Sequence, residues 1–226
     1  MSIRPAGEIR FGDTETVTAV NAADLDGNGL SDLVVGLSTT GLDDYGRTRP
    51  AFSTLFLFEQ SGKSWKYLWK SSPMNKAGPK NEPVGDRISE ILPSMDTNDG
   101  ELHVRAESGD YLLRFEEGHY LMENDPSPVS APVVGRDLAE YFRFPVSQPF
   151  FFMKKERQYL FLVRDGVRLE IYRFKPEADP SFLRAGSLKT GPVSAFGVFR
   201  NARDGRDLLC VGLEDGSLRF YQLGGM

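Results

Sequence analysis

Residues 193–223, VSAFGVFRNARDGRDLLCVGLEDGSLRFYQL, contain three short apolar runs separated by two turns with Asp-Gly in each. Val, Phe, Leu and Tyr dominate the runs, and such residues favour half-buried strands. Asp-Gly, by contrast, favours tight turns between antiparallel strands. The stretch therefore predicts three consecutive antiparallel strands. Similar runs and turns fill the rest of the chain, so we expect an all-β protein.

The same order of strands and turns occurs four times, at a spacing of roughly 50 to 60 residues, which is typical of β-propeller blades and other repeats. The first three repeats each supply four strands, whereas the last supplies three. An unassigned strand, GEIRF at 7–11, precedes the first repeat. Its pairing with the last repeat would leave few free sheet edges.

We therefore predict one β-propeller domain over residues 1–226, with four blades of four antiparallel strands. The blades are expected at roughly 14–72, 84–123, 148–190 and 193–223, with strand 7–11 completing the last. A two-sheet sandwich is the alternative, since the same alternation of apolar and polar residues would serve it.

Composition excludes several classes of function. The formal net charge is −5 and the pI is near 5.2, which argues against a nucleic-acid partner because such partners select basic surfaces. No apolar run is long enough for a membrane-spanning helix. The first residues lack the charged and apolar blocks of a secretory signal. The single cysteine, Cys210, lies in an apolar run and is expected to be a buried thiol.

The stretch DLDGNGLSD at 24–32 predicts a metal site. Side-chain oxygens occur at its first, third, fifth and ninth positions, Gly29 allows a sharp turn, and a backbone carbonyl is available at the seventh position. Such an oxygen set suits Ca²⁺. The expected ligands are Asp24, Asp26, Asn28, Leu30 and Asp32. The alternative is an Asx-rich turn that satisfies its own backbone amides.

An EF-hand is excluded, because Val35 stands where the bidentate glutamate is required and strand-like runs flank the loop. The arrangement instead resembles the FG-GAP/VCBS repeat of integrin-α-type β-propellers. The matching residues are Phe11-Gly12, the aspartates and asparagine of the loop, and the closing Gly36. Leu37-Ser38 replaces the family's usual small-Pro end.

The resemblance implies a single structural Ca²⁺ site, because the corresponding turns of the other repeats lack the full oxygen set and the third carries KKER at 154–157. The family's common seven blades do not fit into this length. The resemblance also favours an extracytoplasmic location, in the periplasm or at the cell surface.

No catalytic motif is present, and His103 and His119 lie among strand residues, so we expect a non-enzymatic protein. The first hypothesis is a scaffold for a protein partner. Long loops often carry recognition, and the insert at 38–52 offers the candidate binding residues Asp43, Asp44 and Tyr45. The alternative is a carbohydrate-binding propeller. In SWKYLWK at 64–70, alternation would place Trp65, Tyr67 and Trp69 on one strand face, where they would either stack on sugars or pack between blades.

Overall fold

The computed structural model describes residues 1–42, 45–61, 64–74, 76–77, 83–84, 86–93, 100–125, 142, 147–154, 157–178, 181–200 and 205–225. These residues form an all-β protein whose main strands make four separate four-stranded antiparallel sheets. This confirms the all-β prediction with four antiparallel sheets. Four separate sheets differ from the two-sheet sandwich, which was the alternative architecture compatible with the alternation of apolar and polar residues.

Each of the first three sheets uses consecutive strands. The first contains β2 (Glu15–Ala23), β3 (Asp32–Leu42), β4 (Thr48–Ser61) and β5 (Ser64–Lys70). The second contains β8 (Ile88–Pro93), β9 (Leu102–Ala106), β10 (Gly109–Glu116) and β11 (His119–Asn124). The third contains β12 (Ser147–Lys154), β13 (Arg157–Arg164), β14 (Arg168–Phe174) and β15 (Phe182–Lys189). In the sequence, the first two sheets are separated by a small ribbon of β6 (Lys76–Ala77) and β7 (Pro83–Val84).

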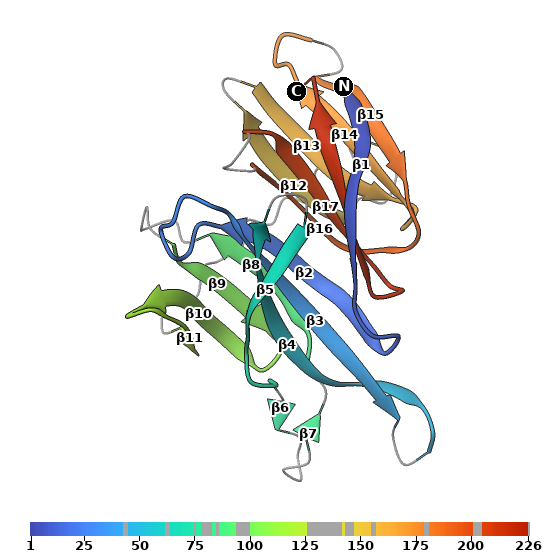
Figure 1. The fold of residues 1–226 in the computed structure, drawn as a ribbon. Helices are drawn as coiled ribbons and strands as arrows, with labels where there is room; N and C mark the ends of the chain where they lie inside the picture. Colours follow the sequence, from blue (N-terminus) through green and yellow to red (C-terminus); the bar gives the residue numbers. More distant parts are fainter. Residues whose placement is uncertain are drawn as a thin grey trace.

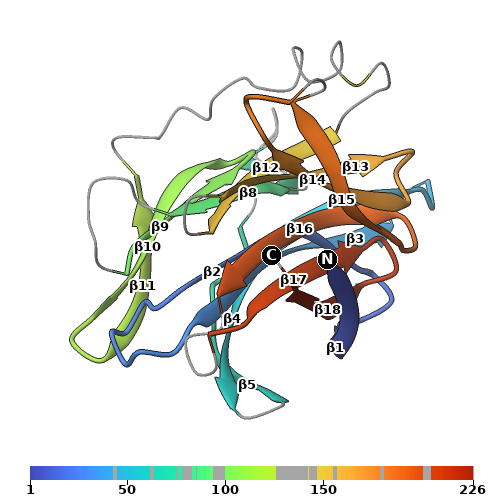
Figure 2. The same cartoon turned by 90° about the horizontal axis from the view of Figure 1, so that it is seen from above.

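The fourth sheet joins the two ends of the chain. It contains β16 (Val193–Arg200), β17 (Asp207–Leu213) and β18 (Ser217–Gly224). The N-terminal strand β1 (Ser2–Arg10) pairs with β18 and forms an edge of this sheet. The pairing runs from Ser2 opposite Gly224 to Arg10 opposite Ser217. The N-terminal strand thus completes the last sheet, as the sequence predicts, and is longer than 7–11. Figures 1 and 2 show the two chain ends side by side.

The sheets are held together by apolar clusters between neighbours. In Figure 1 the third and fourth sheets lie above the first and second. One cluster joins the third sheet to the fourth, a second joins the fourth to the first, and a third joins the first to the second. The first strands of these sheets are in contact, since β2 lies against both β16 and β8. Burial of these faces is the main stabilising term for the arrangement.

The third sheet has a second apolar face. Leu160, Leu162 and Tyr172 are buried there, with Phe142 and Phe182 packed against them. In the described part of the chain, no buried apolar cluster joins this face to the second sheet. Most of the segment that connects the two sheets lies outside the described residues.

Candidate functional site

The loop between β2 and β3 folds as a series of Asx turns. The amide of Asn28 donates to Asp26 Oδ1 at 3.1 Å, and the amide of Leu30 donates to Asn28 Oδ1 at 2.7 Å. The amide of Gly29 donates to Asp24 Oδ2 at 2.9 Å. Gly27 and Gly29 have φ values of +70° and +82°, a conformation that other residues adopt at a cost. The predicted tight turn is therefore present between two strands.

Two carboxylate oxygens in this loop are buried without a hydrogen-bond partner. Asp32 is fully buried; its Oδ2 accepts from the amide of Leu25 at 3.1 Å, while its Oδ1 has no partner. Oδ1 of Asp24 is likewise buried and unpartnered. Buried polar atoms are normally satisfied, and an unpartnered one calls for an explanation such as an ion. These two oxygens are the strongest structural indication of a ligand in the loop.

Electrostatics around Asp32 point the same way. Burial raises the pKa of its carboxyl to about 7, the Leu25 amide opposes this, and the negative charges of Asp26, Asp24 and Glu59 raise it further. Glu59 lies directly opposite Asp32 in the β3–β4 register. A cation would favour the ionised form of this group of acids. The loop is thus an acidic site, and among the described residues none forms an ion pair with Asp24, Asp26, Asp32 or Glu59.

Gly100, just before β9, and Tyr120 on β11 lie close to the loop. Gly100 packs so closely that a β-carbon there would lie 2.7 Å from the carbonyl oxygen of Leu25. Burial, followed by the charges of Asp32 and its neighbours, raises the pKa of Tyr120 on β11. The sequence alone does not predict that Gly100, Tyr120 or Glu59 lies near the loop. Strand pairing and sheet packing bring these residues close to residues 24–32.

The predicted ligands are thus arranged in two ways. Asp24 and Asp32 each direct one oxygen to a place where the protein offers no donor. Asp26 and Asn28 use their oxygens within the turn, and the side-chain amide of Asn28 donates to Asp26 Oδ2 at 2.9 Å. Over the described residues, no three Asp, Glu, His or Cys side chains form a ready-made metal cluster. The residue types suit a hard cation.

Tyr45, a candidate binding residue of the 38–52 insert, lies at the end of the long β3–β4 hairpin. Tyr45 is 82% exposed, and the neighbouring Leu42 is 75% exposed. The guanidinium carbon of Arg47 lies 5.5 Å from the centre of the Tyr45 ring. Asp43 and Asp44, the other candidates here, lie outside the described residues.

The prediction that Trp65, Tyr67 and Trp69 lie on one face of β5 is wrong. The register between β4 and β5 shifts between Tyr67 and Trp69, and this irregularity reverses the side on which Trp69 falls. Trp65 stacks on Phe220 of the fourth sheet with ring centres 5.0 Å apart. Trp69 instead packs towards Tyr120 of the second sheet, at 6.3 Å. Both tryptophans pack between sheets, and Tyr67, at 53% exposure, is the exposed member of the three.

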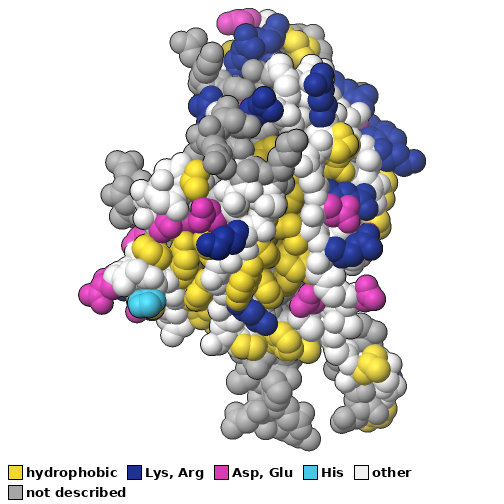
Figure 3. All heavy atoms as spheres, in the orientation of Figure 1, with side chains coloured by type: hydrophobic (Ala, Val, Ile, Leu, Met, Phe, Trp, Pro, Cys, Tyr) yellow, Lys and Arg dark blue, Asp and Glu magenta, His cyan; other side chains and the backbone are white. Residues whose placement is uncertain are grey.

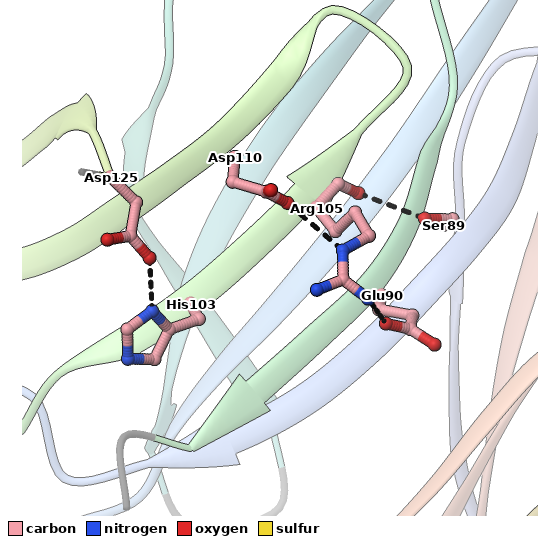
Figure 4. A network of polar contacts seen from close by, with 6 residues as sticks. All are labelled: Ser89, Glu90, His103, Arg105, Asp110 and Asp125. Atoms are coloured by element: carbon pink, nitrogen blue, oxygen red, sulfur yellow. Dashed lines mark hydrogen bonds and ion pairs between the residues drawn. The ribbon is translucent and has the colours of Figure 1, made fainter. Parts of the chain in front are cut away.

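The second sheet carries a polar network on its remaining face (Figure 4). His103 Nδ1 lies 2.5 Å from Asp125 Oδ2. Arg105 bridges Asp110 and Glu90 at 3.0 and 2.8 Å. The hydroxyl of Ser89 donates to the backbone carbonyl of Arg105 rather than to His103. The histidine is thus paired with a carboxylate, but Ser89 is not placed to act as its nucleophile.

Within the described residues, no helix has the length and apolar character needed to cross a membrane. No protein-family model matches this chain, and no curated protein matches it either.

Proposed function

We propose that the four sheets are the blades of a small β-propeller of FG-GAP/VCBS type. Three observations support this architecture. The sheets are four-stranded and antiparallel, consecutive sheets share apolar clusters at three interfaces, and the N-terminal strand closes the sheet formed by the C-terminal residues. Joining first and last strands in one sheet prevents a ring from opening at its ends.

We further propose that the β2–β3 loop holds one structural Ca²⁺ ion. Asp24 and Asp32 would supply the buried oxygens that have no partner, and Asp26, Asn28 and the Leu30 carbonyl would complete the protein ligands. The ion would neutralise the repulsion among the three aspartates and Glu59. The single observation that carries this proposal is the buried, unpartnered Oδ1 of Asp32.

The proposed role is non-enzymatic: the protein is a scaffold that holds a protein partner. The β3–β4 hairpin supports this role. It contains the two longest strands of the described chain and extends beyond its sheet in Figure 1. It exposes Leu42 and Tyr45 near its end. Exposed aromatic and aliphatic side chains on a rigid support are typical anchors of protein interfaces.

Carbohydrate binding is the alternative, with Tyr67 as the exposed aromatic residue to stack on a sugar. The burial of Trp65 and Trp69 between sheets leaves less aromatic surface for this role than a one-face stripe would. A glycan array with and without a calcium chelator addresses it directly. Loss of a calcium-dependent glycan signal in Tyr67→Ala would replace the protein-scaffold proposal with the carbohydrate alternative.

A cross-linking experiment tests the scaffold role. The protein carries a photoreactive group in place of the exposed Arg47, within the hairpin, and is mixed with an extract of its source cells. A second sample carries the group at the exposed turn residue Asp165. The proposal predicts a discrete adduct from the hairpin only, and its loss when Leu42 and Tyr45 are both replaced by serine. Equal labelling from both positions, or none from the hairpin, would contradict it.

A further inference from the structure

A basic cavity lies beside the third sheet, where Met1 and Gly225 near the two chain ends also line it. Its volume is about 320 Å³, close to the lower limit for small-molecule sites. Four of the residues that line it are basic: Arg157, Arg173, Lys175 and Arg184. Tyr159, only 2% exposed, and Leu183 contribute apolar surface. Among the described residues that line the cavity, none is acidic.

The strand pattern explains why the cavity exists. On β14, Leu169 and Ile171 are fully buried against the fourth sheet, and alternation places Arg173 on the same face. An apolar residue at this position would continue the core towards the end of the strand. The half-buried Arg173 instead places a charge at this position, opposite Tyr159 in the β13–β14 register. The apolar interface therefore ends in a polar, cationic hollow.

The surrounding chain is basic although the whole protein is acidic. Residues 154–175 contain seven Lys or Arg and three Asp or Glu, in a chain of formal net charge −5. Figure 3 shows Lys and Arg side chains gathered over the part of the molecule where β13–β15 and β1 lie in Figure 1. A concentration of one charge at a concave site attracts ligands of the opposite charge.

Over the described residues, Arg184 is the one basic residue of the cavity with a carboxylate partner. Arg184 Nη2 lies 3.2 Å from Oε1 of the buried Glu170, so its charge is already paired and its position is fixed. Within the described part of the chain, the side chains of Arg157, Arg173 and Lys175 form no ion pair. Three unpaired cations around one hollow repel one another, and a bound anion would remove that repulsion.

We propose that this cavity binds a small organic phosphate. A phosphate group carries close to two negative charges in a compact form and accepts several hydrogen bonds, and guanidinium groups match its geometry with paired N–H donors. Arg157, Arg173 and Lys175 would contact the phosphate, and Tyr159 and Leu183 would contact the organic part. The site is separate from the β2–β3 loop, so it does not depend on the proposed calcium ion or protein partner.

The test is calorimetric titration of the full chain with glycerol phosphate, at about 150 mM salt so that loose surface attraction is screened. Glycerol serves as the neutral control and citrate as the carboxylate control. We expect saturable binding of one glycerol phosphate per chain, no binding of glycerol, and weaker binding of citrate. Arg173→Gln and Lys175→Gln should each weaken phosphate binding at least tenfold, because each removes a charged hydrogen-bond donor.

Arg168→Gln is the matched control, since it removes the same charge from the other end of β14 and should change the affinity less than twofold. An equal loss of affinity in Arg168→Gln would show attraction by net charge and would overturn the proposal. So would the absence of saturable phosphate binding, or citrate binding as tight as that of glycerol phosphate. If Arg173→Gln does not fold, Lys175→Gln decides the question, because Lys175 lies just beyond the last residue of β14.

Discussion

Gly212 of β17 lies directly against Val17 of β2: a β-carbon at Gly212 would be 2.4 Å from Val17 Cγ1. The same close approach occurs between Gly197 and Val20, at 3.0 Å, and between Gly36 and Ile88, at 3.0 Å. Each of these glycines stands where a strand of one sheet meets the next sheet. The absence of a side chain therefore sets how closely neighbouring sheets pack around β2.

Gly212→Ala is expected to lower the free energy of unfolding by about 1–3 kcal/mol, the usual cost of overpacking a core. Urea denaturation followed by tryptophan fluorescence measures it, since Trp65 packs in the same interface. Gly7→Ala is the control, because a β-carbon there would lie 3.8 Å from Phe220, an ordinary contact. Equal stability of the two variants would contradict the close packing.

Calcium is expected to stabilise the protein by mass action. A ligand that binds the native state alone adds about 2.7 kcal/mol at 100 times its dissociation constant. Thermal unfolding in a calcium chelator and in excess CaCl₂ should show this increase for the wild type. Asp26→Ala should abolish it, as should Asp32→Asn, which keeps an oxygen for the Leu25 amide but removes the charge.

Asp165→Asn controls for the loss of one acidic residue, since Asp165 is exposed in the turn between β13 and β14 with φ +54° and asparagine tolerates this conformation. Its calcium response should equal that of the wild type. An undiminished response in Asp26→Ala would place any calcium site elsewhere.

The stability of the calcium-free protein should fall as the pH rises from about 4 to 7. The Asp32 carboxyl has an ordinary pKa of 3.8 when unfolded and a pKa raised to about 7 in the native state, chiefly by burial. Between these values the native state binds more protons than the unfolded state, so raising the pH favours unfolding, by on the order of a few kcal/mol. Asp32→Asn should remove this decline.

The same proton should compete with calcium. Below about pH 7, the ion must displace the proton of Asp32 before it can bind, so its apparent affinity should fall as the pH is lowered. Calorimetry at a series of pH values measures this dependence. A constant calcium affinity from pH 5 to pH 8 would show that Asp32 is not a ligand.

Removal of residues 1–10 should strongly destabilise the fourth sheet. The deletion removes the partner from one edge of β18, whose other edge stays paired with β17, and uncovers the buried Leu218 and Phe220 beneath Ile9. We expect loss of cooperative unfolding together with aggregation, as exposed strand edges promote pairing between molecules. A synthetic peptide of residues 2–11 should partly restore the native circular dichroism, and a scrambled peptide should not. Cooperative unfolding of the truncated chain at wild-type stability would contradict the closing role of β1.

Much of the strand organisation could be predicted because its signals are local. The three apolar runs of 193–223 became β16, β17 and β18, since alternation and Asp-Gly turns depend on neighbouring residues alone. The missing strand of that sheet could be inferred by counting. The turn at 24–32 could likewise be predicted, because Asp26 and Asn28 bond to backbone amides two residues away.

Other features could not be predicted because they depend on contacts between distant residues. Simple alternation put Trp65 and Trp69 on one face, but the register shift against β4 separated them. Glu59 and Tyr120 reach the acidic loop through strand pairing and sheet packing. The basic cavity likewise combines Arg157, Arg173 and Arg184 from three strands.

The sequence by itself determined that the chain forms short antiparallel strands, where its turns fall, and that oxygen donors gather at residues 24–32. Strand propensity, period-two patterning and turn chemistry act over a few residues, so they can be recognised in a single sequence. The tertiary structure decided which oxygens of that loop are left buried without partners, on which side each aromatic residue of β5 packs, and where unpaired cations meet. Burial and charge proximity arise only when sheets distant in sequence come together.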